Sequence, residues 1–344
     1  MRLLSAGEAP PRAGEALARV ERQSDRAPKR SRYSSVHGEE QERISCPVCS
    51  AENDRLCFEV QDTMFGSPGK YQLVECQQCT QRYVNPRPTD AALARHYPND
   101  YLCYTNFDSE HWLLRWAFRR MQAGQARRRL RQIEKATGKL AAGSRVLDVG
   151  CGRGELMGLL KRERSCSCIG TDINPNVLAI VNGELGIPVV EGSLLDLEFE
   201  YGSFDLVTMT EYLEHESRPG DVVARAAQLV KPGGHVAIEV PDISGPPGRW
   251  FRENWWQIDC PRHLNFFSPQ TLGQLLEAQG LEVVETRRYG MLTSMGYSLL
   301  QAMGFRYHGS NKLLYLSLSA ALGLPFVPLL PWLPDFMMVM ARKK

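Results

Sequence analysis

A glycine-rich turn directly follows an apolar stretch in the segment VLDVGCGRGEL, which contains Gly150, Gly152 and Gly154. Glycine tolerates positive φ and allows a ligand to approach the backbone, while the helix expected after the turn presents unpaired N–H groups. Asp172 lies 22 residues after Gly150, at the end of the next apolar stretch. There its carboxylate can accept hydrogen bonds from both hydroxyls of a ribose. These residues predict a binding site for a ligand that contains a nucleoside.

Two alternatives to such a site remain open for this turn. The first is a tight strand-to-helix connection that binds nothing, and the second is a nicotinamide dinucleotide site. The dinucleotide fingerprint is G-x-G-x-x-G, whereas the glycines here follow G-x-G-x-G. Asp148, which precedes the turn, either braces the loop or meets an ammonium group, which a nicotinamide dinucleotide does not offer. The spacing and Asp148 together favour a different nucleoside ligand.

Four cysteines occur as two C-x-x-C pairs, Cys46 with Cys49 and Cys76 with Cys79. Each pair holds two sulfur atoms close together, as a tetrahedral Zn²⁺ site requires. The 26 residues between the pairs exceed the usual spacing of about 15–20, and a β-hairpin would absorb the difference. Four thiolates fill the coordination shell, so the expected zinc is structural. Free thiols or a redox pair are the alternatives, and a Ser and a Thr follow the pairs where zinc ribbons often have glycine.

Polar residues end the stretch FDLVTMTEYLEH, which we expect to form the fourth strand of a sheet. Its last two residues, Glu214 and His215, would lie at the carboxyl edge, where open α/β sheets bind ligands. Histidine is the natural general base near neutral pH, so His215, beside Glu214, is the first candidate for removing a proton from a substrate. The alternative is that both residues only position the ligand and the neighbouring helix.

A long insertion follows the fifth expected strand and mixes aromatic with charged residues. Loops of this length at the edge of a rigid sheet commonly carry the substrate site. Arg262 and His263 precede an aromatic pair and could form a platform for an anion and a sugar. His263 and Asp259 together are an alternative candidate for the general base. Capping of the core is the alternative role for the aromatic side chains.

The elements that must position these residues are short apolar strands that alternate with helices. The expected strands are 145–150, 168–173, 188–192, 204–209 and 235–240, and the expected helices include 174–186 and 268–280. Such alternation indicates a parallel sheet covered by helices on both faces. Pro175 and Pro269 near the starts of the two helices, with Gly186 and Gly280 at their ends, agree with these boundaries.

The 344 residues divide into four expected segments, which are a disordered arm (1–43), a zinc-ribbon module (44–90), a basic helical connector (91–140) and an α/β domain (141–344). The net charge of +2 excludes a uniformly basic nucleic-acid coat, but the long helix expected over 112–139 carries a local charge of +8. The first residues lack the apolar stretch of a secretory signal. We therefore expect a cytoplasmic protein with reduced thiols.

Five segments, in order along the chain, resemble the motifs of class I S-adenosylmethionine-dependent methyltransferases: VLDVGCGRGEL, GTDINP, EGSLLDL, FDLVTMTEYLEH and LVKPGGHVAIEVP. The resemblance implies a Rossmann-like, doubly wound, mostly parallel seven-stranded sheet whose last strand is FMMVMARK. It also implies that Gly150 and Gly152 bind the methionine part of the cofactor, Asp172 the ribose, and the backbone of Ser193 and Leu194 the adenine. Ser193 stands where many relatives have an acidic residue. The residues expected to line the cofactor site are Asp148, Gly150, Cys151, Gly152, Gly154, Asp172, Ile173, Ser193, Leu194, Thr210 and Glu211.

The cysteine pairs and the segments VNPRPT and IDCPRHLNFFSP resemble one subgroup of these enzymes, which is associated with surface polysaccharide, glycolipid and natural-product pathways. This implies a small-molecule or lipid-linked acceptor that carries a sugar, with acceptor-site insertions at 242–268 and 291–335. The apolar run 313–330 is interrupted by one glycine and two prolines. The interruptions indicate a helical hairpin that covers the acceptor pocket or lies on the inner face of a membrane, rather than a spanning helix.

Two other functions stay open. RNA methylation is the first, because some rRNA methyltransferases also join a zinc module to this core and an Arg-rich helix could bind phosphates. The chain has no Asn-Pro-Pro-Tyr-type motif and few aromatic residues among its basic ones, so nucleic acid is the less favoured partner. A non-catalytic cofactor-binding protein is the second, and the polar residues at the sheet edge disfavour it. The sequence leaves the methylated atom and the oligomeric state open.

Overall fold

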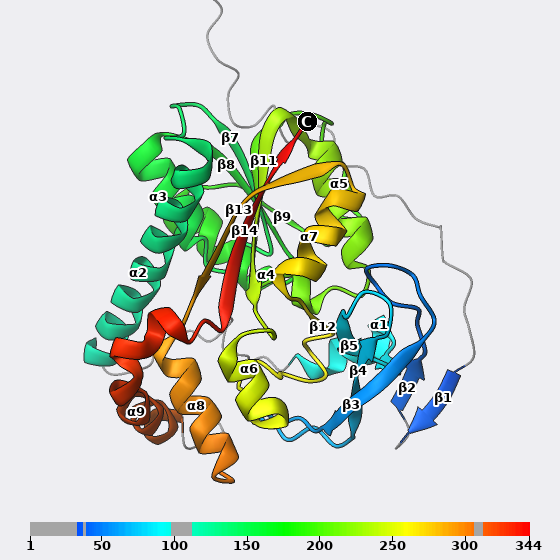
Figure 1. The fold of residues 1–344 in the computed structure, drawn as a ribbon. Helices are drawn as coiled ribbons and strands as arrows, with labels where there is room; N and C mark the ends of the chain where they lie inside the picture. Colours follow the sequence, from blue (N-terminus) through cyan, green and yellow to red (C-terminus); the bar gives the residue numbers. More distant parts are fainter. Residues whose placement is uncertain (1–32, 37–38, 98–111, 306–311) are drawn as a thin grey trace, which may run out of the picture.

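The computed structural model describes residues 33–36, 39–97, 112–305 and 312–344. Its centre is a seven-stranded sheet (Figure 1) that consists of β7 (Arg145–Val149), β8 (Ser167–Asp172), β9 (Val189–Glu191), β10 (Phe204–Thr210), β11 (Val230–Pro241), β13 (Leu281–Tyr289) and β14 (Phe336–Lys343). The strand order is β13-β14-β11-β10-β7-β8-β9. Neighbours from β9 to β11 are parallel, whereas β14 is antiparallel to both β11 and β13. The expected mostly parallel, seven-stranded fold is confirmed.

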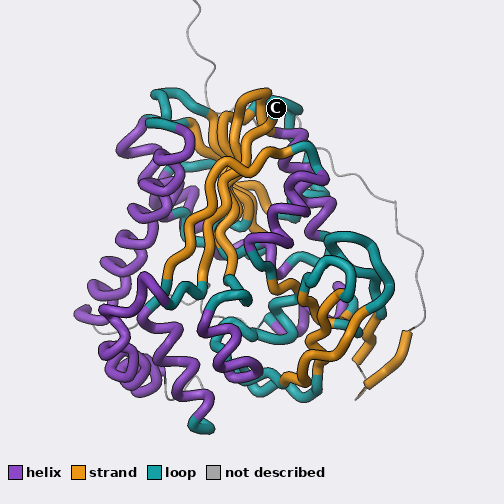
Figure 2. Tube along the Cα trace, viewed as in Figure 1, coloured by secondary structure: helices purple, strands orange, loops and turns teal. Residues whose placement is uncertain are grey.

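Helices cover both faces of this sheet (Figure 2). Successive residues of each strand point to opposite faces, so each face presents apolar side chains that a helical layer must bury. In β7, Val146 packs in the core cluster that contains residues of α2, α3 and α4, whereas Leu147 and Val149 pack in the cluster that contains residues of α5 and α7. These helices are α2 (Trp112–Thr137), α3 (Glu155–Arg164), α4 (Pro175–Ile180), α5 (Pro219–Leu229) and α7 (Pro269–Ala278). The two apolar layers hold the sheet rigid, and the carboxyl edge of the parallel strands lies at the rim of this core.

The start of α7 illustrates how the sequence sets a helix boundary. Ser268 Oγ accepts a hydrogen bond from the Thr271 backbone N–H (3.2 Å), and Thr271 Oγ1 accepts one from the Ser268 N–H (3.0 Å). Pro269 occupies the first helical position, where no N–H partner is needed. The expected opening at Ser268-Pro269 is confirmed. The other expected helix is α4 extended by one π-helical turn to Leu185, and it ends at Gly186 with a φ of 58°.

The Cys module, residues 44–90, is built into the rest of the chain. Its strands β3 (Asp54–Val60), β4 (Tyr71–Cys76) and β5 (Arg82–Val84) form an antiparallel sheet, and β12 (Asn265–Phe266) from the first insertion adds a fourth strand beside β5. Sequence reasoning expected a small separate module. That expectation is wrong in this respect, because the pairing of β5 with β12 joins segments that lie about 180 residues apart in the sequence.

Part of the expected disordered arm forms strands. β1 (Tyr33–Val36) pairs with β2 (Glu39–Glu42), and β2 pairs with β6 (Arg87–Pro88) at the end of the Cys module. The local composition that suggested disorder did not reveal this pairing, since the partner strand β6 lies more than 40 residues away. The rest of the expected arm, residues 1–32 and 37–38, lies outside the described residues.

The connector and the two insertions are mainly helical. The connector begins with α1 (Asp90–Leu93) and a 3₁₀ turn, Ala94–His96, and α2 continues through Gly124 without a break. The insertions contain α6 (Pro246–Phe251), α8 (Leu292–Ala302), α9 (Lys312–Gly323) and η7 (Leu324–Trp332). The run 313–330, expected as a helical hairpin, forms α9 followed by the 3₁₀ segment η7, and α9 packs against both η7 and α8. Within the described residues, no helix is both long and apolar enough to cross a membrane.

Candidate active site

The glycine turn joins β7 to α3 at the carboxyl edge of the sheet. Gly150, Gly152 and Gly154 have φ values of 66°, 49° and 72°, in the region that favours glycine. The turn is held to the next strand by a hydrogen bond from the Cys151 N–H to the Thr171 carbonyl oxygen (2.9 Å). A Cβ atom at Gly152 would have no heavy atom within 4 Å. The backbone at Gly152 is therefore open to a ligand, as the sequence predicts.

Gly150 lies against an aromatic ring that sequence reasoning did not single out. A Cβ atom at Gly150 would lie 2.3 Å from Cδ2 of Tyr212, whose hydroxyl interacts with Ser193 and Glu216. Tyr212 thus links the glycine turn to the loop after β9. Only a residue without a side chain fits between the strand end and this ring.

We expect the substitution Gly150→Ala to weaken binding of S-adenosylhomocysteine about tenfold or more, because it strains the turn and displaces Tyr212. The matched control is Gly202→Ala, because Gly202 has a φ of 58° and no heavy atom near a Cβ position. Isothermal titration calorimetry measures both affinities, and the control should bind like the wild type. Equal affinities of the two variants would contradict a ligand-binding role for the turn.

Two buried carboxylates flank the turn. Asp172, at the end of β8, is 7% exposed, and its oxygens accept hydrogen bonds from the backbone N–H groups of Gly152 (3.0 Å) and Asn174 (2.9 Å). Burial raises the pKa of Asp172, and these hydrogen bonds oppose the rise. Asp148 accepts a 2.6 Å hydrogen bond from Thr208 of β10, and burial raises its pKa to about 6. Asp148 therefore braces two adjacent strands directly beneath the turn.

The other residues predicted for the cofactor site gather at the same edge. Ile173, next to Asp172, is 61% exposed, as a side chain that covers a flat ring would be. The side chains of Cys151 and Leu194 are buried, so only their backbone can contact a ligand. Ser193 follows β9, and Thr210 and Glu211 end and follow β10. The eleven predicted residues therefore lie at one edge of the sheet. Six of them belong to the ends of β8 and β10 or to the loops that follow β8, β9 and β10, and the others lie in or next to the glycine turn.

Two arginines of α2 reach this edge, which sequence reasoning missed. Arg129 donates to Glu239 (2.7 Å) and to Glu211, and Arg128 donates to Glu239 (3.3 Å) while its guanidinium stacks on Tyr289. Glu239 is fully buried in β11. Burial would raise its pKa, but the two guanidinium groups outweigh burial and lower it. The only sequence signal for these ion pairs was the single acidic residue inside the apolar stretch HVAIEV. Because Arg128 and Arg129 are paired with Glu239, fewer cations of α2 are available to bind nucleic-acid phosphates.

The three predicted catalytic residues form one cluster. One ligand atom each of Glu214, His215 and His263 lies within 4.8 Å of the others, and the two imidazole rings are edge-to-face with centroids 4.5 Å apart. Glu214 and His215 belong to a 3₁₀ turn after β10, and the Leu264 N–H donates to the Glu214 carbonyl oxygen (2.8 Å). Glu214 and His263 are buried, whereas His215 is partly exposed.

The hydrogen bonds of the imidazoles set their tautomers. Nδ1 of His263 contacts the Gln257 carbonyl oxygen (2.8 Å), and Nδ1 of His215 contacts the Arg262 carbonyl oxygen (3.2 Å) and the Tyr97 hydroxyl (3.0 Å). A carbonyl oxygen only accepts, so each Nδ1 carries the proton and each Nε2 bears a lone pair. Tyr97 belongs to the connector, directly after the 3₁₀ turn Ala94–His96, and no local sequence pattern predicted this contact.

Burial disfavours the charged form of all three residues of the cluster. It lowers the pKa of His215 to about 3, with His263 acting in the same direction, and it lowers the pKa of His263. Burial raises the pKa of Glu214 well above its ordinary value, and Glu214 Oε2 has no hydrogen-bond partner among the described residues. The two imidazoles are therefore unprotonated and can accept a proton from a substrate group.

The expected anion and sugar platform at Arg262 is wrong. Arg262 is fully buried, and its guanidinium donates to Asp62 of the Cys module (2.8 and 2.9 Å) and to Asp259 (3.0 Å). Asp259 forms an ion pair with Arg262, and its charge also interacts with His263. The cluster of Arg262, Asp62 and Asp259 instead fastens the first insertion to the Cys module, directly beside the catalytic residues.

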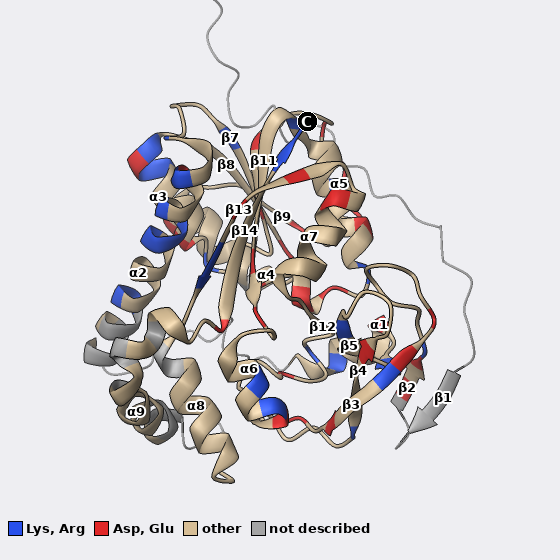
Figure 3. Ribbon diagram, in the orientation of Figure 1, with Lys and Arg blue, Asp and Glu red and all other residues tan. Residues whose placement is uncertain are grey.

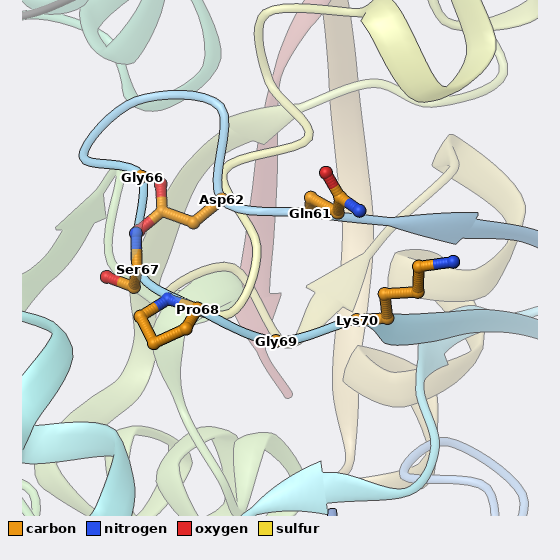
Figure 4. Close-up of a pocket in the computed structure, with 7 residues that line it drawn as sticks. All are labelled: Gln61, Asp62, Gly66, Ser67, Pro68, Gly69 and Lys70. Carbon is orange, nitrogen blue, oxygen red and sulfur yellow. The ribbon is translucent and has the colours of Figure 1, made fainter. Parts of the chain in front are cut away.

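A cavity of about 340 Å³ lies in the loop that connects β3 to β4 (Figure 4). Asp62 shapes this loop, because its carboxylate accepts hydrogen bonds from the backbone N–H groups of Met64, Phe65 and Ser67. The lining residues are Gln61, Asp62, Gly66, Ser67, Pro68, Gly69 and Lys70. None of the residues predicted for cofactor binding or proton transfer lines it.

The four cysteines of the two pairs come together as the sequence predicts. Sγ of Cys46 lies 3.5 Å from that of Cys79, and Sγ of Cys49 lies 3.6 Å from that of Cys76. All four sulfur atoms lie within 4.8 Å of one another. The Ser and Thr that follow the pairs have φ values of 61° and 67°, so both turns adopt the conformation for which zinc ribbons use glycine. The four thiols could hold one tetrahedral metal ion.

A doubly wound sheet with one antiparallel strand inserted beside its last strand, and a glycine turn next to an acidic strand end, define a class I S-adenosylmethionine-dependent methyltransferase. The comparison with family models agrees, because the model of a methyltransferase domain matches residues 113–286, just over half of the chain. The chain belongs to this methyltransferase family.

Named relatives support the same assignment. The chain is 41% identical over 181 residues to a ubiquinone biosynthesis O-methyltransferase of Ralstonia nicotianae, over 48% of this chain and 75% of that protein. It is 40% identical over 114 residues to the protein of the same description from Cronobacter sakazakii, over 31% of this chain and only 46% of that protein. A solved phosphoethanolamine N-methyltransferase 2 of Haemonchus contortus, in complex with S-adenosyl-L-methionine, shares the fold with a TM-score of 0.51 and 16% identity, over 83% of this chain and 71% of that one.

Proposed function

We propose that this methyltransferase acts on a hydroxyl group of a small-molecule or lipid-linked acceptor, and that the acceptor carries a sugar of a glycan, glycolipid or natural-product pathway. The observation that carries the proposal is the compact cluster of Glu214, His215 and His263 at the carboxyl edge of the sheet. A hydroxyl group must lose a proton when it is methylated, and the partly exposed His215 has an Nε2 lone pair to accept it. The descriptions of the two curated relatives, which are O-methyltransferases, agree with a hydroxyl acceptor.

S-adenosylmethionine, when bound, supplies an electrophilic methyl group on a sulfonium sulfur. The backbone at Gly150 and Gly152 and the carboxylate of Asp172 would hold it, and the exposed Ile173 side chain would be available to its base. His215 accepts the acceptor's proton at Nε2, while the Arg262 carbonyl oxygen fixes its ring through Nδ1. His263 and Glu214 position that ring. Alignment of the acceptor supplies most of the remaining acceleration.

We infer that the four cysteines hold a structural Zn²⁺. A tetrahedron with Zn–S distances of about 2.3 Å has S–S distances of about 3.8 Å. The two closest S–S distances of 3.5 and 3.6 Å agree with that geometry. Four cysteine ligands leave no open coordination position, so the ion would stabilise the Cys module and take no part in methyl transfer.

Removal of one ligand tests the zinc site. We expect the wild type to contain about one equivalent of zinc and Cys49→Ser to contain less than about one tenth, because three thiolates bind far more weakly at neutral pH. Cys57→Ser is the matched control, since Cys57 is a free thiol of β3 outside the cluster. Elemental analysis of the purified proteins gives the ratio. Less than about half an equivalent in a normally folded wild type would remove the proposal.

The acceptor is tested by incubating the protein with S-adenosylmethionine labelled in the methyl group and with lysate fractions that contain RNA, lipids or small molecules. We expect label in a sugar-containing species of the lipid or small-molecule fraction, in a bond that is stable to mild base as an ether is. Labelled RNA would favour the nucleic-acid alternative, and label on nitrogen or carbon would contradict the hydroxyl assignment. Cofactor binding without label in any fraction would favour a non-catalytic protein.

A further inference from the structure

Large apolar side chains lie exposed at one end of the molecule. They come from the first half of α2, the end of α8, α9 and η7, of which the last three pack against one another (Figure 1). Trp332 of η7 is 78% exposed, and Trp112 of α2 is 60% exposed. We call this surface the apolar face, and its members are Trp112, Trp116, Met121, Met303, Phe305, Leu314, Leu318, Leu329 and Trp332.

The ring contacts of Arg128 place α2 on this side. The Arg128 guanidinium lies 3.6 Å from the centroid of Tyr289, which stacks on Phe336 at 5.8 Å. Tyr289 ends β13 and Phe336 begins β14, so both lie at the carboxyl edge of the parallel strands. Phe336 follows the end of η7 by four residues. The chain from Trp112 to Arg128 extends beyond that edge by about 24 Å of helix, at 1.5 Å per residue. Two tryptophans of α2 therefore project from the same edge as α8, α9 and η7.

The described elements that carry the apolar face have charges of one sign. The sequence contains no Asp or Glu between Glu285 and Asp335, nor between Trp112 and Ile133. On α2, Arg119 and Arg120 are exposed, and the Arg120 guanidinium lies 5.2 Å from the centroid of Trp116. Figure 3 shows α8 and α9 without acidic colour, in contrast to the helices at the other end of the sheet. Among the described residues, the first half of α2, α8, α9 and η7 therefore combine exposed apolar side chains with cations and contain no Asp or Glu.

We propose that the apolar face docks on an anionic lipid bilayer and lies in its headgroup region. Tryptophan prefers the interface between headgroups and acyl chains, and arginines beside it attract anionic lipids. α9 has only 12 residues and is followed by a proline-interrupted turn, so this hairpin fits a surface-lying element. A second copy of the chain is a poorer occupant, since Arg119 and Arg120 would meet like charges.

Docking would present the candidate active site to the membrane. Ser298 of α8 accepts a hydrogen bond from the Trp256 N–H (3.0 Å), and Tyr297 stacks on the Trp256 ring at 4.1 Å. Trp256 and His263 belong to the same insertion, so the membrane-facing hairpin is packed against the segment that carries a catalytic residue. A lipid-linked acceptor could then enter without leaving the bilayer surface. This last step rests on the proposed function, whereas docking itself does not.

Vesicle sedimentation tests the docking. The full chain is mixed with vesicles of phosphatidylcholine alone or of phosphatidylcholine and phosphatidylglycerol at 3:1, in about 0.1 M and about 0.5 M salt. We expect at least about tenfold stronger binding to the anionic vesicles, weakened by the higher salt. Leu314→Ser with Trp332→Ser should reduce binding about tenfold or more, and Arg119→Gln with Arg120→Gln should remove the preference for anionic lipid.

Matched controls use exposed residues elsewhere. Leu56→Ser with Tyr201→Ser removes two apolar side chains that are 51% and 67% exposed, and Arg55→Gln removes an exposed cation. These variants should bind like the wild type, and thermal unfolding checks that all variants are folded. Equal binding by the apolar-face and control variants would overturn the proposal. So would the absence of vesicle binding, whether or not the face then mediates self-association or RNA binding. Binding of S-adenosylhomocysteine in solution, measured in parallel, reports separately on the proposed function.

Discussion

Replacing His215 by asparagine is expected to lower kcat by about 10²–10⁴-fold, the usual contribution of a general base. Asparagine has the approximate size of the imidazole and keeps an N–H group that can donate to the Arg262 carbonyl oxygen. It removes the Nε2 lone pair that accepts the proton. The affinity for S-adenosylhomocysteine should stay within about twofold of the wild type, because His215 touches the acceptor side of the site.

The position of His215 in the cluster provides the control. His263→Asn should cause a smaller loss of kcat, because His263 is buried behind the His215 ring and acts through it. Full turnover by His215→Asn with normal cofactor binding would show that Glu214 and His215 only position other groups. A loss of cofactor affinity as large as the loss of kcat would likewise contradict a role in proton transfer.

The pH profile offers a second readout for His215. Burial lowers its pKa from 6.5 to about 3, so the imidazole is already unprotonated at pH 5. A general base works in its unprotonated form, and kcat/KM of the wild type should therefore show no inflection near pH 6.5. An inflection there that disappears in His215→Asn would mean that His215 is solvated as an ordinary histidine in the free enzyme.

Local patterns were sufficient for the parts of the fold that depend on residues close in sequence. The glycine turn, the Ser268 cap and the strand ends with Asp172 and Glu214 depend on neighbours within a few residues, and they lie where the sequence places them. The cysteine pairs carry their own geometry, because two thiols three residues apart already face one centre.

Partners far apart in sequence could not be predicted in this way. Glu239 is paired with Arg129 across 110 positions, and Tyr97 contacts His215 across 118. In the sequence, Arg129 is one of nine cations on a helix, and nothing local distinguishes it from those that face solvent. Arg262 was misinterpreted for the same reason. The residues next to an arginine in the sequence do not show whether its side chain is buried or binds an anion. Here the ion pair with Asp62, 200 residues away, shows that Arg262 is buried.

That ion cluster underlies the second large effect. We expect Arg262→Met to lower the free energy of unfolding by about 3–5 kcal/mol, because the buried carboxylates of Asp62 and Asp259 would lose the cation that compensates their charge. Arg249→Met, an exposed position of the same insertion, should change it by less than about 0.5 kcal/mol. Urea denaturation followed by circular dichroism measures both. Adding Asp62→Asn and Asp259→Asn to Arg262→Met should restore part of the loss, whereas a purely steric defect would not respond.

The dependence on pH separates a charge effect from a packing effect. Burial alone would raise the pKa of Asp62, but Arg262 outweighs it and holds the pKa at about 2, below the ordinary 3.8. In the wild type the unfolded chain therefore binds more protons between pH 2 and 4, and stability from this group rises with pH through that interval. Without Arg262, only the hydrogen bonds from the loop backbone still oppose burial, so the folded-state pKa of Asp62 rises and its contribution to stability shrinks. The deficit of Arg262→Met should consequently be smallest near pH 2 and grow as the pH rises through 4, and a deficit independent of pH would show that the cluster acts only through shape.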